Sequence, residues 1–186
     1  MDFSHYSDEP VAVAVRLTNT LNVVTGEDSL QSREAVAAFM RDALSDRDGR
    51  LADATEKDLR ALRALRSRLR SVWEADSAAD AAAAINTVLE TVDARPRISV
   101  HGGAPPHLHF EPHADDPIKD LGAMTAMGLS VALIEGGWER FGICSSTTCN
   151  DVFIDTSKNR SRRHCSETCT TRESVAAYRA RHRARP

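Results

Sequence analysis

Hydrophobic residues recur at intervals of three and four positions through much of the first 135 residues. The pattern is clearest between Thr55 and Ala75, where apolar residues and arginines take turns at helical spacing. Because residues three and four apart share one face of a helix, this stretch predicts a helix with a buried stripe and a solvated arginine face. Thr55, with Asp58 three residues later, is typical of a helix N-terminus. The predicted stripe is Leu59, Leu62, Leu65, Leu69, Val72 and Trp73, and the predicted outer face is Arg60, Arg63, Arg66, Arg68 and Arg70.

Three other stretches show the same helical spacing, at residues 32–44, 76–92 and 117–135. Asp116 and Pro117 suit the start of the last of these, and Gly136-Gly137 ends it. Residues 11–24 fit a strand and a helix about equally on pattern alone. The expected core face of the 117–135 helix is Leu121, Met124, Met127, Val131 and Ile134.

Only one region changes to a period of two. Residues 98–101 and 108–111 alternate around a turn rich in Gly and Pro, which predicts a β-hairpin. The expected fold is therefore mostly α with one β-hairpin, an α+β chain. Histidines in and beside the hairpin raise the question of a metal site, but we expect them on its solvated side, opposite Leu108 and Phe110. They are His101, His107, His109 and His113.

All the cysteines of the chain lie in one short segment, as Cys144, Cys149, Cys165 and Cys169. Two close pairs separated by a short loop are typical of four thiolates that bind one tetrahedral Zn²⁺. Two disulfides, an iron–sulfur cluster or redox thiols are the alternatives, and His164 could replace one cysteine as a ligand. We favour structural zinc, because nothing directs the chain to an oxidising compartment and no C-x-x-C pair occurs.

The residues around these cysteines also form a pattern. Val152-Phe153-Ile154 predicts a short strand, Asp155-Thr156-Ser157 a turn, and residues 158–163 a basic loop. After Cys169 we expect a helix that Thr170 or Thr171 caps. One side of this helix, with Val175, Tyr178 and His182, is expected to lie on the zinc site, and arginines occupy the other sides.

Charge divides the chain into an acidic body and a basic end. Residues 140–186 carry ten Lys and Arg against four Asp and Glu, a net charge of +6, and residues 1–139 carry 14 against 23, a net charge of −9. Such a split is typical of a module that meets polyanions, although a solvated tail or one docked on its own acidic body would look the same. The candidate nucleic-acid contacts are Lys158, Arg160, Arg162, Arg163, His164, Arg172, Arg179, Arg181 and Arg183.

The C-terminal segment resembles the CGNR zinc finger, which follows an ABATE-type domain in bacterial regulators. The matching residues are Cys144 and Cys149, then Phe153 to Ser166, Cys169 to Arg172, and Tyr178 to Arg181. This chain has Thr170-Thr171 where the family name records Gly-Asn, and His164 where the family usually has Trp. The resemblance also favours a helix at residues 11–24, since ABATE domains often open on a Leu-rich segment ending in Asn-Thr.

These observations predict an ABATE-like helical domain at residues 1–136 and a zinc-binding module at 137–186, with the first able to fold without the second. The resemblance implies a DNA-binding transcriptional regulator whose N-terminal domain senses a ligand or mediates dimerisation. The alternative is a zinc-stabilised protein-interaction or RNA-binding module. We expect no enzyme, because the chain has no nucleophile grouping, phosphate loop or open zinc pattern. Without a signal peptide or a long uninterrupted apolar run, a cytoplasmic protein that avoids membranes is expected.

Overall fold

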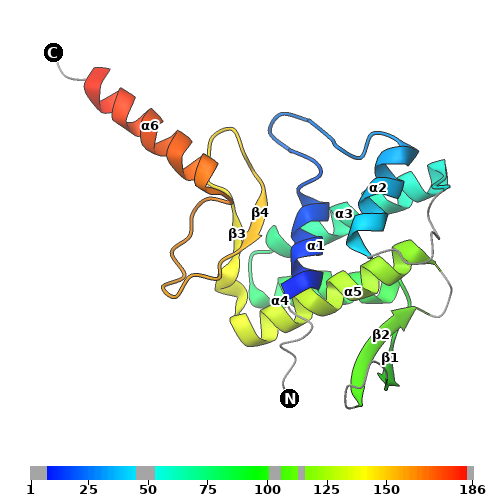
Figure 1. Cartoon of the computed structure of the whole chain (residues 1–186). Coiled ribbons are helices and arrows are strands. Elements are labelled where there is room, and N and C mark those ends of the chain that lie inside the picture. The colour runs from blue at the N-terminus through cyan, green and yellow to red at the C-terminus, as the bar shows by residue number, and fades with distance from the viewer. Residues whose placement is uncertain (1–7, 45–52, 101–105, 113–115, 184–186) are drawn as a thin grey trace.

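The computed structural model describes residues 8–44, 53–100, 106–112 and 116–183 (Figure 1). The body consists of helices α1 (Asp8–Thr18), α2 (Arg33–Ala43), α3 (Glu56–Trp73), α4 (Ala78–Thr91) and α5 (Pro117–Val131), with an antiparallel hairpin of β1 (Ala94–Ser99) and β2 (His107–Pro112). The C-terminal module contains the antiparallel pair β3 (Phe141–Ile143) and β4 (Val152–Ile154), followed by α6 (Glu167–Arg183). The mostly α prediction with one hairpin is confirmed, and a second, three-residue strand pair is added.

Helix α5 is central to the body, where it contacts α1, α3 and α4. The predicted leucine stripe of α3 is buried, and the side chain of Thr55 caps this helix in a reciprocal pair with Asp58. Gly128 allows α1 and α5 to lie close together, because a Cβ at this position would come within 2.7 Å of the Pro10 Cβ. Small residues and leucines of α5 thus build the centre of the core.

The predicted segment at residues 11–24 forms a helix, α1, as the resemblance favoured. Its expected C-terminal bound at residue 24 is wrong. The helix ends at Thr18, and Leu21 instead forms an isolated antiparallel bridge with Asp28. The side chain of Asn22 accepts hydrogen bonds from the amides of Val24 and Thr25, which stabilises a turn at this point. Local hydrogen bonding by polar side chains therefore outweighs the helical spacing of the apolar residues.

The prediction of a solvated arginine face on α3 is wrong for two of its five arginines. Arg66 is only 6% exposed and forms a bidentate ion pair with Asp28, with its two terminal nitrogens 2.6 and 2.9 Å from the two carboxylate oxygens. Arg70 is 9% exposed and donates to the backbone carbonyl of Asn150 at 3.1 Å. Arg63 is half-buried and donates to the Leu30 carbonyl, and Arg60 and Arg68 are exposed, as expected. The helical spacing identified the positions, but not the loops that come to cover them.

The end of α5 also differs from the prediction. A wide turn at Ala132–Gly136, with the spacing of a π-helix, follows α5 and rotates Ile134 outward, where it is 80% exposed rather than part of the core. Met124 and Met127 are half-buried. The chain then breaks at Gly137, whose φ of 86° is a conformation that favours glycine. The stretch Pro117–Gly136 is long and apolar enough to cross a membrane by composition, but half of it is buried within this fold.

The hairpin packs one strand against the body, since β2 contacts α5. Leu108 and Phe110 are half-buried there, and Ile98 on β1 is 78% exposed. The prediction that the hairpin histidines lie on its solvated side stays a prediction. The described residues exclude His101 and His113, and also the side chains of His107 and His109.

The C-terminal module shares the core of the body. Phe141 and Val152 belong to the same buried cluster as the leucines of α3 and α5. Trp138 stacks on Phe141 at 5.5 Å between ring centroids, at the junction between the body and the module, and Phe141 also contacts Trp73. In Figure 1, β3 and β4 lie beside the helical body, and α6 extends away from it.

Candidate metal centre and nucleic-acid interface

The cysteines come together from four places on the fold. Cys144 follows β3, Cys149 precedes β4, Cys165 lies in the loop before α6, and Cys169 stands in the first turn of that helix. Hydrogen bonds hold the first pair, because the amide of Cys144 donates to the carbonyl of Asp151 at 2.8 Å and the amide of Cys149 donates to that of Ser146 at 3.2 Å. A strand pair with a tight turn thus faces the start of a helix.

The four sulfur atoms form one cluster, and all lie within 4.8 Å of one another. The Sγ of Cys165 is 3.6 Å from that of Cys149 and 3.7 Å from that of Cys169. Sulfurs at about 2.3 Å from a central zinc in a tetrahedron would lie about 3.8 Å apart, so the observed spacing fits one ion. All four cysteines are free, and the separations are far beyond the length of a disulfide bond, which is about 2 Å.

The surroundings of the cluster also suit a bound cation. Three of the cysteines are at most 6% exposed, and Cys165 is half-buried. Burial raises the pKa of Cys149 far above its usual range and raises the pKa of Cys165 to about 12. A hydrogen bond from Ser166 lowers the pKa of Cys169. Buried thiolates become favourable only where a cation offsets their charge, so the donor set fits a metal ion.

The loop between the cysteine pairs is ordered around a buried carboxylate. Asp155 is 3% exposed and accepts hydrogen bonds from the amides of Ser157 and Arg162, at 2.7 and 2.8 Å. Burial alone would raise the pKa of Asp155, but these hydrogen bonds outweigh it and the pKa is lowered. Arg140 donates to the carbonyl of Asp155 at 2.6 Å and so fastens the loop to β3. The predicted strand at 152–154 is β4, which leads into this loop.

Helix α6 begins earlier than the sequence indicated. It starts at Glu167, so Thr170 and Thr171 do not cap it, and the hydroxyl of Ser166 accepts from the amide of Cys169 instead. The expectation that one side of this helix lies on the zinc site is also wrong, because Val175 and Tyr178 are 42% and 55% exposed. The sequence offered no sign that α6 leaves the module after its first two turns.

Glu173 and Arg172 anchor α6 at its base, and neither contact was predicted. The carboxylate of Glu173 accepts from the hydroxyl of Ser146 at 2.7 Å and from the amide of Thr147 at 3.2 Å. Arg172 donates to the hydroxyl of Thr148 at 2.8 Å. Both contacts join the helix to the turn between Cys144 and Cys149, so they reinforce the link that the cysteine cluster makes.

The predicted basic residues divide into two groups. Arg160, Arg162 and Arg172 have protein partners: Arg160 pairs with Glu139 at 3.5 Å, and Arg162 donates to the carbonyls of His164 and Cys165. The His164 ring lies 3.5 Å from the hydroxyl of Thr170 and outside the sulfur cluster. The remaining basic side chains are exposed and have no partner within the described ranges; these are Lys158, Arg163, Arg179 and Arg181. The Arg183 side chain lies outside the described residues.

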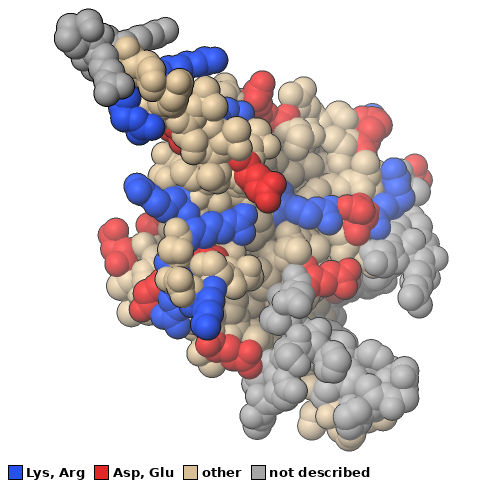
Figure 2. Space-filling view, turned by 60° about the vertical axis from the view of Figure 1, so that its left-hand side comes forward, with Lys and Arg blue, Asp and Glu red and all other residues tan. Residues whose placement is uncertain are grey.

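Figure 2 shows basic side chains on α6 and on the surface next to it, with acidic side chains among them on the rest of this face. Basic side chains therefore lie both on the protruding helix α6 and on the surface beside it. Because α6 packs along no helix or strand of the described chain, its sides stay open to a partner.

Two family models match the chain. The CGNR zinc finger covers residues 140–182, and the ABATE family, described as "Putative stress-induced transcription regulator", covers residues 12–136. The chain belongs to the ABATE family. The resemblances seen in the sequence are thereby confirmed, and both descriptions are those of a regulator or a zinc finger and not of an enzyme. A search of curated proteins found no match.

Proposed function

We propose that this protein is a zinc-dependent, DNA-binding transcription regulator, in which Cys144, Cys149, Cys165 and Cys169 hold one Zn²⁺. The ion would act structurally, because four protein ligands leave no open position for a substrate. The observation that carries the proposal is the exposed basic helix α6, which the cysteine cluster fixes at its first turn. The N-terminal unit, residues 1–136, would sense a ligand or mediate dimerisation.

Helix α6 has the properties of a DNA-binding element. It is polar on nearly all sides and packs along no other helix, so packing alone does not account for its position. The metal site, together with Glu173 and Arg172, would hold its base and present the remainder to solvent. A helix of about 10–12 Å in diameter fits the major groove, which is about 12 Å wide.

The free basic side chains are the best candidates for direct contacts. Lys158 and Arg163 on the loop would bind phosphates, and Arg179 and Arg181 on α6 would bind phosphates or base edges. Arg160, Arg162 and Arg172 would mainly hold the loop and helix in place, since their guanidinium groups already have partners. The net charge of −9 on residues 1–139 would keep the body away from the duplex.

A titration of a fluorescent random duplex at several salt concentrations tests the proposal. If about four phosphates are contacted, log affinity should fall with log salt at a slope of about −4. The double variant Arg163→Gln/Arg179→Gln should weaken binding and reduce the slope by about two. Its matched control is Arg60→Gln/Arg68→Gln, which removes two exposed arginines from the body and should change little. Absence of binding at low salt would overturn the proposal.

A second candidate, a protein-interaction or RNA-binding module, has one observation in its favour. Val175 and Tyr178 are exposed on the same helix, and the Tyr178 ring lies 3.9 Å from that of His182. Exposed aromatic and apolar groups serve protein interfaces and stack on unpaired bases. Tighter binding to single-stranded RNA than to duplex DNA in the same titration would favour this candidate.

A further inference from the structure

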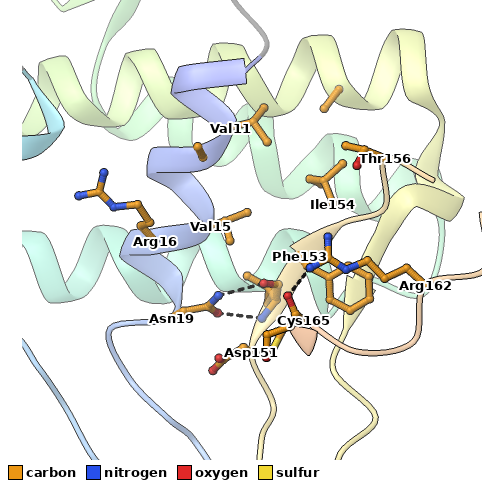
Figure 3. Close-up of a pocket in the computed structure, with 14 residues that line it drawn as sticks. Val11, Val15, Arg16, Asn19, Asp151, Phe153, Ile154, Thr156, Arg162 and Cys165 are labelled. Carbon is orange, nitrogen blue, oxygen red and sulfur yellow. Dashed lines mark hydrogen bonds between the residues drawn. The ribbon is translucent and has the colours of Figure 1, made fainter. Parts of the chain in front are cut away.

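A cavity of about 560 Å³ lies between α1 and the zinc-binding module (Figure 3). Its volume is within the range of small-molecule sites, about 300–1,000 Å³. One wall is apolar and comes from Val11, Ala12 and Val15 on α1, with Phe153 and Ile154 of β4 opposite. Asp151, Arg162 and Cys165 also line the cavity. The cavity is thus formed jointly by the N-terminal body and the C-terminal module, and Cys165 is part of its wall.

Two charged groups of opposite sign line this cavity without neutralising each other. The Asp151 carboxylate has one contact in the described chain, the Cys165 Sγ at 3.7 Å. Arg162 lies over the Phe153 ring, with its guanidinium carbon 4.9 Å from the ring centroid, and it donates only to backbone carbonyls. No ion pair joins either group to another described residue. Asp151 therefore has no cationic partner, and Arg162 could exchange its neutral carbonyl acceptors for a ligand carboxylate, which is a stronger acceptor.

Two of the other polar side chains that line the cavity, Asn19 and Arg16, already have partners, and Thr156 adds an exposed hydroxyl. Both ends of the Asn19 amide are bonded to the backbone of Val152, at 2.9 and 2.8 Å. Arg16 points away from the other labelled side chains in Figure 3 and pairs with Asp42. A ligand would therefore meet one free carboxylate, one guanidinium and an apolar wall.

We propose that this cavity binds a small zwitterion with an apolar body, such as an α-amino acid with a hydrophobic side chain. The ligand ammonium group would pair with Asp151 and its carboxylate with Arg162, and its side chain would lie against Val11, Val15 and Ile154. A simple anion would leave Asp151 without a partner, and a simple cation would leave Arg162 without one. A ligand with both charges satisfies both groups.

Such a ligand would act on the DNA-binding module directly. Arg162 belongs to the basic loop at 158–163, and Cys165 is one of the proposed zinc ligands. Occupancy of the cavity would draw Arg162 from its bonds to the carbonyls of His164 and Cys165 and shift the loop that carries Arg163. This coupling rests on the proposed function, but ligand binding itself does not.

Calorimetric titration of the full zinc-loaded chain with L-valine, leucine, isoleucine, methionine, phenylalanine and tryptophan tests the proposal. At least one should bind with saturation, and its carboxamide and its deaminated carboxylic acid should each bind at least tenfold more weakly. Equal binding of the amino acid and the deaminated acid would remove Asp151 from the site and overturn the assignment. Binding of none of the six would overturn it as well.

Variants then place the ligand in this cavity. Ala12 is exposed and lines the cavity, so Ala12→Trp should fill it and abolish ligand binding without disturbing the core. Ala83→Trp is the matched control, because Ala83 is also exposed and lies on α4, which contributes no residue to the cavity, and this variant should bind normally. Unchanged binding by Ala12→Trp would refute the location. DNA titration of the same variants without ligand separates failure of this site from failure of the DNA-binding proposal.

Discussion

Asn19→Ala should destabilise the whole chain, because Asn19 joins the body to the C-terminal module. Its amide donates to the Val152 carbonyl at 2.9 Å and accepts from the Val152 amide at 2.8 Å. Val152 is fully buried, so the variant would leave two backbone groups without partners. Each such group costs about 1–3 kcal/mol, and because Asn19 is only half-buried we take about 1–2 kcal/mol for each, which predicts a loss of about 2–4 kcal/mol in the free energy of unfolding.

Urea unfolding followed by tryptophan fluorescence measures this loss. Trp73 and Trp138 lie at the junction of the two parts, where they report on its separation. With a slope of about 2 kcal/mol per M, the midpoint should fall by about 1–2 M in a single transition. Asn159→Ala, at an exposed position in the basic loop, is the matched control and should change the midpoint little. A loss below about 0.5 kcal/mol for Asn19→Ala would refute the reasoning.

Three further changes test other parts of the structure. Gly142→Ala should destabilise the module by about 2 kcal/mol or more, because its Cβ would lie 2.4 Å from the buried Phe153 ring. Gly136→Ala, whose Cβ would come no closer than 3.0 Å to the Arg140 side chain, is its control and should cost less in the same thermal denaturation series. A hydrogen bond from the buried Arg66 lowers the pKa of Asp28. The ionised Asp28 should therefore stabilise the fold above about pH 4, and this stabilisation should be lost as the pH falls below that value. Asp28→Asn should flatten this acid dependence of the free energy of unfolding, measured by urea unfolding at a series of pH values. A chain ending at residue 136 should still unfold in one cooperative transition by calorimetry, at a lower temperature than the full chain. Loss of this transition would contradict the prediction that the N-terminal body folds alone.

The sequence predicted those parts of the fold that depend on local pattern. The α3 stripe and its Thr55–Asp58 cap follow from spacing over a few residues, and the structure confirms both. The cysteine spacing likewise indicated the sulfur cluster, because each pair is local and the connecting loop is short. Local chemistry of this kind needs no knowledge of how distant segments pack.

Contacts between distant segments could not be predicted in the same way. Arg66 and Arg70 share the spacing of a solvated face, and only the positions of Asp28 and Asn150 in the folded chain explain why they are buried. The direction of α6 was missed for the same reason. Asn19 belongs to the Asn-Thr ending that the resemblance used, but its partner, Val152, lies 133 positions away. A polar side chain at the end of an apolar segment is the one signal that could have indicated such a junction.

The metal content of the purified chain tests the central claim most directly. Elemental analysis combined with the intact mass of protein prepared without oxidant should give one zinc per chain and four cysteines in thiol form. Removal of the ion by a chelator should then eliminate the order of α6 and the basic loop, measured as lost amide protection, because the ion would be the link between the first cysteine pair and the pair at the base of α6. A metal-free chain that keeps this protection, or a chain with two disulfides, would contradict the account.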